Sequence, residues 1–155
     1  MVLGSKTDIE VAAKACDTLE EFGVPYELRV CSAHRTPRAL IKLIDESKAD
    51  VFIAVAGMAA ALPGVVAAHT TKPVIGLPVG GKVPFDSLLS TVQMPPGIPV
   101  ASVGVDRGEN AALLAVEILA IRDEALRPKL EAHRKKLEKA TEDGNREVTR
   151  KGPKQ

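Results

Sequence analysis

Residues 51–57 read Val-Phe-Ile-Ala-Val-Ala-Gly, an unbroken apolar run that stops at a glycine. A strand that is buried on both faces gives such a continuous run, whereas a strand with one wet face alternates. A second run of this kind, Pro-Val-Ile-Gly-Leu-Pro-Val at 73–79, follows a short helical pattern at 62–69. Two buried strands joined by a helix indicate a parallel sheet that helices cover on both faces.

The alternation of strand and helix continues in both directions from this centre. Toward the amino terminus, the predicted strands and helices cover, in chain order, residues 2–3, 7–22, 26–30 and 36–48. Toward the carboxyl terminus they cover residues 86–93, 99–105 and 110–122. This order predicts an α/β domain built on a doubly wound parallel sheet.

Two helix starts carry sequence signals. Thr7 and Glu10 have the spacing of a capping box, and Gly23 is a natural stop for the helix that follows them. Thr36 suits an N-cap, and Pro37 suits the first helical position after it.

The chain of 155 residues fits one domain, to which we assign residues 1–123. Residues 124–142 read as a charged helix that packs either on the core or on a neighbouring subunit. Residues 143–155 are polar and basic, and we expect a frayed, disordered tail there.

The composition argues against several classes of partner. The formal net charge is +1 and only 3% of residues are aromatic, so neither a basic surface nor a base-stacking platform for nucleic acid is indicated. No apolar run reaches the roughly 18 residues that a membrane span requires. The opening residues do not resemble a signal peptide. We therefore expect a cytoplasmic protein without nucleic-acid or membrane partners.

The cysteines and two of the three histidines give no sign of a special site. Cys16 and Cys31 are expected to be buried free thiols. His69 and His133 are expected in solvent. Because the histidines are scattered, no metal cluster is predicted.

Polar and glycine-rich segments follow the predicted strands. They are residues 4–8, 32–37, 57–64 and 78–85. In an open parallel sheet, ligands bind beyond the carboxyl ends of the strands, so we expect these segments to share one ligand edge.

Gly4-Ser5-Lys6-Thr7 leads into a helix, where free N–H groups and hydroxyls suit a phosphate. A strand-to-helix turn needs a glycine and a cap in any case, so this segment alone leaves a purely structural role open. Asp8 either complements the helix dipole or accepts hydrogen bonds from ribose hydroxyls.

The segment Ser32-Ala33-His34-Arg35-Thr36-Pro37 carries more chemistry. Arg35 can hold a phosphate with its planar fork, and Ser32 can donate a hydrogen bond beside it. His34 is of the residue type that titrates near neutrality and moves protons. The position of His34, between an anion-binding residue and a helix start, favours a functional role over that of an ordinary exposed surface histidine.

Together these segments resemble the PurE family, the 5-(carboxyamino)imidazole ribonucleotide mutases and related carboxylases. The resemblance runs in order through residues 4–8, 32–37, 56–64, 86–95, 97–100 and 110–115. Ser-Ala-His-Arg-Thr-Pro at 32–37 and Val-Gln-Met-Pro-Pro-Gly-Ile-Pro-Val at 92–100 are its most distinctive parts.

The resemblance implies a flavodoxin-like three-layer α/β/α sandwich and a homo-octamer with active sites at subunit interfaces. It implies conversion of N5-carboxyaminoimidazole ribonucleotide to 4-carboxy-5-aminoimidazole ribonucleotide, without metal or organic cofactor. His34 would be the general acid/base. The implied substrate-binding residues are Ser5, Asp8, Ser32, Arg35, Gly57, Ala59 and Ala60.

The family has a second branch that carboxylates aminoimidazole ribonucleotide directly with CO2, and the segments here look like the mutase branch. The chain departs from the mutase pattern at Ala61, where histidine is usual. The stretch between Val79 and Asp86, which would form a lid, is shorter than usual. Strand one is also short, with three residues before Gly4.

Overall fold

The computed structural model describes residues 1–151 and contains a five-stranded sheet in the order β2-β1-β3-β4-β5. The strands are β1 (Val2–Leu3), β2 (Arg29–Val30), β3 (Phe52–Ala56), β4 (Val74–Pro78) and β5 (Ala101–Ser102). Every neighbouring pair is parallel, which confirms the predicted sheet. The strand order is that of a flavodoxin-like fold.

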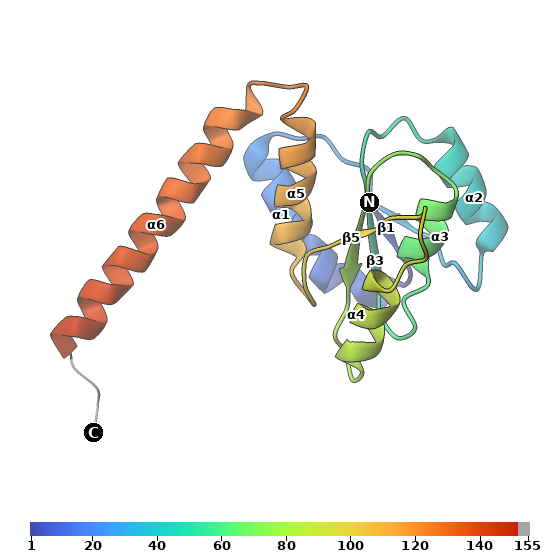
Figure 1. Cartoon of the computed structure of the whole chain (residues 1–155), viewed down its shortest axis with the longest axis horizontal. Helices are drawn as coiled ribbons and strands as arrows, with labels where there is room; N and C mark the ends of the chain where they lie inside the picture. The colour runs from blue at the N-terminus through green and yellow to red at the C-terminus, as the bar shows by residue number, and fades with distance from the viewer. Residues whose placement is uncertain (152–155) are drawn as a thin grey trace.

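Helices cover both faces of the sheet and complete three layers (Figure 1). One face carries α1 (Ile9–Phe22), which a 3-10 turn, η1 (Lys6–Asp8), precedes, and α5 (Gly108–Leu119). The other face carries α2 (Pro37–Glu46), α3 (Leu62–Ala68) and α4 (Pro84–Val92). The flavodoxin-like three-layer sandwich is therefore confirmed.

The side chains of β3 alternate between two apolar cores, one on each face. Ile53 and Val55 lie in the core beneath α1 and α5. Phe52, Ala54 and Ala56 lie in the core beneath α2 and α3. Because both sets are buried, the strand reads as a continuous apolar run in the sequence.

Gly76 in β4 allows α4 to lie very close to the sheet. A Cβ atom at position 76 would be 2.2 Å from Thr91 Cγ2 and 3.2 Å from Pro63 Cβ. Thr91 is fully buried, and its hydroxyl donates to the Ser87 carbonyl at 2.8 Å. The missing side chain thus fixes the depth at which α4 packs.

The edge strands are shorter than the sequence predicts. The expected strand at 26–30 pairs only at Arg29 and Val30, and the expected strand at 99–105 pairs only at Ala101 and Ser102. Alternation and β-rich composition indicate an extended chain, but a strand also needs a neighbouring segment that pairs with it. β1, the partner of β2, contributes only two residues.

The helix caps also differ from the expectation. Ser5, rather than Thr7, caps the first helical turn, and the Asp8 carboxylate accepts from the Ser5 N–H at 2.9 Å. Thr36 occupies the N-cap position of α2 but does not cap it with its side chain. Its hydroxyl instead bonds to the backbone of Ser32. Both differences bring side chains to the ligand edge.

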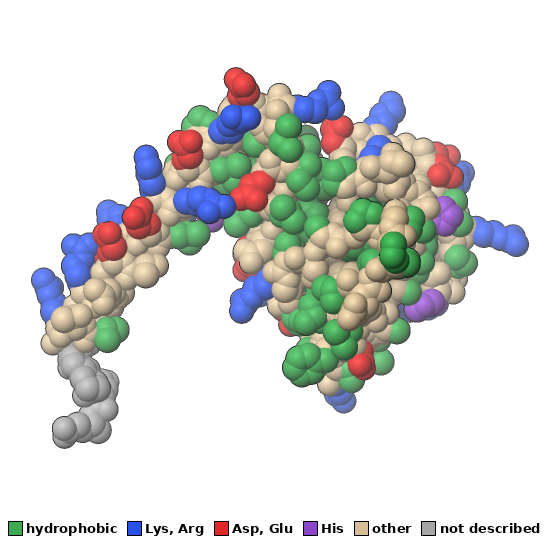
Figure 2. Space-filling view, in the orientation of Figure 1, with side chains coloured by type: hydrophobic (Ala, Val, Ile, Leu, Met, Phe, Trp, Pro, Cys, Tyr) green, Lys and Arg blue, Asp and Glu red, His purple; other side chains and the backbone are tan. Residues whose placement is uncertain are grey.

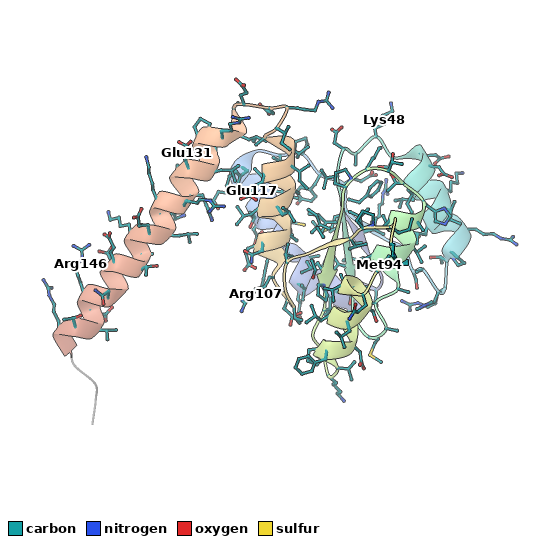
Figure 3. All side chains as sticks on the ribbon, in the orientation of Figure 1. Lys48, Met94, Arg107, Glu117, Glu131 and Arg146 are labelled. Atoms are coloured by element: carbon teal, nitrogen blue, oxygen red, sulfur yellow. The ribbon has the colours of Figure 1, made fainter. Side chains whose placement is uncertain are left out.

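The last helix, α6 (Leu126–Lys151), projects away from the domain as a long rod (Figure 1). Its first turns pack on the same chain: Lys129 Nζ donates to the Phe22 carbonyl at 2.6 Å, and Arg134 pairs with Glu117 of α5 at 2.9 Å. Figure 3 shows Glu117 on the side of α5 that faces α6.

The expected tail from residue 143 is wrong as far as Lys151, because the helix continues through it. An Asp143–Arg146 ion pair at spacing i,i+3 supports this stretch. Residues 152–155 of the expected tail lie outside the described residues. His133, expected in solvent, is half-buried, with its ring centroid 5.7 Å from that of Phe22.

Other expectations hold. Cys16 and Cys31 are buried free thiols, and His69 is exposed. Within residues 1–151, no helix combines the length and apolar character needed to cross a membrane.

Candidate active site

The carboxyl ends of β1 and β3 lie side by side where the strand order reverses, the place at which open α/β sheets bind ligands. Gly4 is the first residue beyond β1, and its N–H donates to the Val55 carbonyl at 2.9 Å. A Cβ atom here would lie 3.7 Å from Asp8 Oδ2 and 3.8 Å from Ala56 Cβ. Gly4 therefore lies between the Asp8 carboxylate and the end of β3.

Asp8 is a buried carboxylate at this edge, with 6% of its surface exposed. Its oxygens accept from the Ser5 N–H at 2.9 Å and from the Thr7 hydroxyl at 3.3 Å. Burial raises the pKa of Asp8 above its ordinary value, while the Ser5 and Thr7 donors and the Arg35 charge oppose that rise. The arrangement holds an acceptor group at the edge.

Arg35 links the loop after β2 to the end of β1. Its Nη2 donates to the Gly4 carbonyl at 2.8 Å, and its Nε donates to Ser32 Oγ at 3.3 Å. Ser32 Oγ also accepts from the Arg35 N–H at 3.2 Å. The guanidinium is exposed, so it keeps donors available for an anion while the protein fixes its position.

Thr36 closes the loop that carries His34. Its hydroxyl accepts from the Ser32 N–H at 3.0 Å and donates to the Ser32 carbonyl at 3.2 Å. It also lies 3.4 Å from the buried Cys31 thiol. The His34 side chain is exposed on this closed loop, and among residues 1–151 no hydrogen bond holds it. It is therefore free to meet a ligand.

Gly57 begins a tight turn after β3, which the Ala60 N–H closes by donating to the Gly57 carbonyl at 3.0 Å. Met58 and Ala60 both have positive φ angles, 55° and 37°. Such angles are uncommon for residues with side chains and are frequent at functional sites. Ala60 is buried, while Ala59 and Met58 are exposed at the edge.

The sequence-predicted residues thus fall into two groups. Ser5, Asp8, Ser32 and Arg35 lie together at the ends of β1 and β2, joined through Gly4. The turn that contains Gly57, Ala59 and Ala60 follows β3, beside Gly4. Within residues 1–151, no hydrogen bond or ion pair joins His34 to this turn.

Sequence reasoning missed one contact at the same edge. The Asp106 carboxylate, in the loop after β5, accepts from the Gly80 N–H at 2.9 Å in the loop after β4. The only signal for it was an acidic residue directly after a predicted strand.

A cavity of about 900 Å³ lies at the opposite edge of the sheet. Its lining includes His69, Asp45 and Lys72. Lys72 already donates to the Ser47 carbonyl at 2.9 Å and lies over the Phe52 ring. Because its cation is engaged within the fold, we place the functional site at the carboxyl edge instead.

An exposed apolar surface adjoins that carboxyl edge. It consists of Phe85, Leu89 and Val92 of α4, and we call it the α4 patch. Met58 of the turn after β3 is exposed as well. Met58 and Phe85 are 70% and 74% exposed. Figure 2 shows hydrophobic side chains gathered over the region of α4. Exposed apolar patches of this kind mark interaction surfaces.

Comparisons with known proteins show which family the chain belongs to. The family model described as AIR carboxylase matches residues 1–140. The N5-carboxyaminoimidazole ribonucleotide mutase of Methanocaldococcus jannaschii is 59% identical over 140 residues, which cover 90% of this chain and 89% of that protein. The Bacillus subtilis protein of the same name is 49% identical over 141 residues, covering 86% and 87%.

Among solved structures, PurE of Treponema denticola is similar with a TM-score of 0.84 and 28% identity, and 94% of each chain is covered. The resemblance to the PurE family is confirmed at the level of both sequence and fold. The chain belongs to the AIR carboxylase family.

Proposed function

We propose that the protein is a mutase of purine biosynthesis that converts N5-carboxyaminoimidazole ribonucleotide to 4-carboxy-5-aminoimidazole ribonucleotide. One observation carries the proposal: Asp8 and the Arg35–Ser32 pair meet through Gly4 at the switch point, with the exposed His34 between Ser32 and α2. Relatives that carry the mutase name support the reaction.

In this proposal Arg35 and Ser32 bind the phosphate, and Ser5 and Asp8 bind the ribose. The guanidinium is held by the Gly4 carbonyl, so little side-chain freedom is lost when an anion binds. The ionised Asp8 accepts hydrogen bonds from sugar hydroxyls. Its buried position makes a carboxylate that lacks a ligand partner unfavourable, which favours occupancy of the site.

His34 acts first as an acid and then as a base. The N-carboxylate of the substrate is a carbamate, and a proton delivered to its nitrogen breaks the C–N bond and releases CO2. The ring C4 then attacks this CO2 to form the new C–C bond. His34 takes back the C4 proton, so protons balance and the ring regains its aromatic character.

The turn formed by Gly57, Ala59 and Ala60 holds the CO2 in the interval between these two bonds. Small side chains let backbone N–H groups approach the carboxylate oxygens, and a confined CO2 meets C4 before it escapes. The positive φ angles of Met58 and Ala60 are consistent with a turn shaped for a ligand rather than for minimum strain.

We further propose that the chain assembles as a homo-octamer with active sites at subunit interfaces. The α4 patch supports this, because it begins at Phe85, just after the loop at 79–83, so a second copy seated there would lie close to the site. The cytoplasmic location and the absence of a cofactor stay predictions.

Two alternatives have specific motives. A direct carboxylase would use the same phosphate and ribose contacts with free CO2. A binding or assembly scaffold is motivated by Ala61, which stands at the N-cap of α3 where the mutase pattern has histidine. A substrate-specific assay separates all three. Turnover of the N-carboxylated substrate without bicarbonate supports the mutase, turnover of the parent ribonucleotide with bicarbonate supports the carboxylase, and binding alone supports the scaffold.

For the residue assignment, we expect His34→Asn to lower kcat roughly a hundredfold or more, because proton transfer loses its carrier. Calorimetric affinity for the product ribonucleotide should change little. His69→Asn, an exposed histidine at the opposite edge, is the matched control and should retain full activity. Normal turnover by His34→Asn would refute the assignment.

A further inference from the structure

The loop between β5 and α5 holds Asp106 in a conformation that its neighbours fix. Its φ angle is +57°, in the left-handed region that non-glycine residues seldom occupy. Its N–H donates to the Pro78 carbonyl at 2.9 Å, and its Oδ1 accepts from the Gly80 N–H at 2.9 Å. Asp106 is therefore hydrogen-bonded both to Pro78, the last residue of β4, and to Gly80 in the loop that follows.

The fit around the carboxylate is close enough to require glycine at position 80. A Cβ atom there would lie 2.6 Å from Asp106 Oδ2 and 3.1 Å from Val105 Cγ1. Gly80 is buried, so a larger residue could not swing outward. The hydrogen bond from the Gly80 N–H to the Asp106 carboxylate therefore depends on a glycine at position 80.

The contact continues from Gly80 to the proposed CO2 turn. Val79 precedes Gly80, and its N–H donates to the Ala56 carbonyl at 2.8 Å. A Cβ atom on Gly57 would lie 3.4 Å from Val79 Cβ and 3.5 Å from the Val79 carbonyl. Val79 thus forms one wall against which the turn packs, and Asp106 holds the residue that follows that wall.

No cation competes for the Asp106 carboxylate, since among residues 1–151 it forms no ion pair. Its neighbour Arg107 lies at the start of α5 (Figure 3). The Arg107 side chain lies beside Gly104. The Asp106 carboxylate therefore accepts a hydrogen bond from the backbone of the loop after β4. A residue that acts on a reaction through such a contact is a positioning residue.

We infer that Asp106 is a positioning residue for the reaction, which holds the loop at 79–83 so that the turn at 57–60 keeps its shape. The inference rests on the proposed mutase function. Since the phosphate and ribose contacts lie at β1 and β2, loss of Asp106 affects the carboxyl transfer more than ribonucleotide binding.

The test uses three variants of the full chain. Asp106→Ala removes the acceptor, and Asp106→Asn keeps an oxygen that can accept from the Gly80 N–H. Asp123→Ala is the matched control, because Asp123 also accepts from a loop N–H, that of Ala125 at 3.1 Å, but is exposed between α5 and α6.

We expect Asp106→Ala to lower kcat roughly tenfold to a hundredfold, while KM for the ribonucleotide changes little. Asp106→Asn should restore most of the rate, and Asp123→Ala should match the parent. Equal kcat in Asp106→Ala and the parent overturns the inference. So does a rise in KM that accounts for the whole loss, or a loss that Asp106→Asn shares.

Amide hydrogen exchange provides a readout that does not depend on turnover. Exchange in the peptides that cover 79–83 and 57–60 should be faster in Asp106→Ala than in the parent and in Asp106→Asn. Unchanged exchange overturns the inference even if the enzyme is active. If the parent lacks mutase activity, the proposed function fails, and the exchange result still decides whether Asp106 positions the loops.

Discussion

Asp8 combines two properties that pull in opposite directions. The protein surrounds its carboxylate with the Ser5 N–H and the Thr7 hydroxyl, yet it buries the group deeply enough that burial raises its pKa. Because burial disfavours the charged form, an ionised Asp8 lowers the stability of the fold.

This balance predicts a pH-dependent effect of Asp8→Asn. The folded-state pKa lies above the unfolded value of 3.8, so the ionised form weakens the fold above both values and is absent below them. Asn keeps an oxygen for the Ser5 N–H. We expect a higher Tm than the parent at pH 7, a gain that shrinks as the pH falls toward 4, and weaker ribonucleotide binding. A lower Tm at pH 7 would mean that the lost donors outweigh burial.

The sequence predicts some residues of the site but not others. Ser5, Asp8, Ser32 and Arg35 could be placed together because the ends of parallel strands share one edge. The Gly80–Asp106 contact could not, since it joins two loops 26 residues apart through one backbone N–H. The strained φ angles of the Gly57 turn likewise depend on what packs around it.

At the scale of elements, β4 and α4 form a unit whose spacing Gly76 sets. We expect Gly76→Ala to lower the free energy of unfolding by about 1–3 kcal/mol, because its Cβ would overlap the buried Thr91 methyl. Urea unfolding measures the loss. Adding Thr91→Ser removes the methyl and should recover part of it, whereas Gly144→Ala in exposed α6 should not destabilise.

If the double variant is no more stable than Gly76→Ala alone, the contact with Thr91 does not set the spacing.

The sequence indicated β3 and β4 well because both strands are buried on both faces along their whole length. It overestimated β2 and β5, because periodicity describes one chain segment while pairing depends on two. It also ended the last helix early, because a change to polar composition resembles a boundary.

At the scale of the whole molecule, the α4 patch leaves large apolar side chains in solvent next to the proposed site. In a homo-octamer these side chains would be covered. We expect Phe85→Glu to lower the mass measured by light scattering from eight times 16.4 kDa to a smaller species, and to reduce turnover with it. Ile121→Glu, equally exposed but outside the patch, is the control. Disruption by Ile121→Glu alone would place the interface elsewhere.

The close packing of α1 on α5 has a consequence for how the protein is made. A Cβ atom on Gly108 would lie 2.5 Å from the Val11 carbonyl, so the two helix backbones nearly touch, although about a hundred residues separate them in the chain. During translation at roughly 5–20 residues per second, α1 leaves the ribosome about 5–20 seconds before its partner exists. Its apolar face is without its final cover for that interval. The nascent chain is therefore most exposed to chaperones and to aggregation through its first helix, and release from that state waits for nearly the last part of the domain to be synthesised.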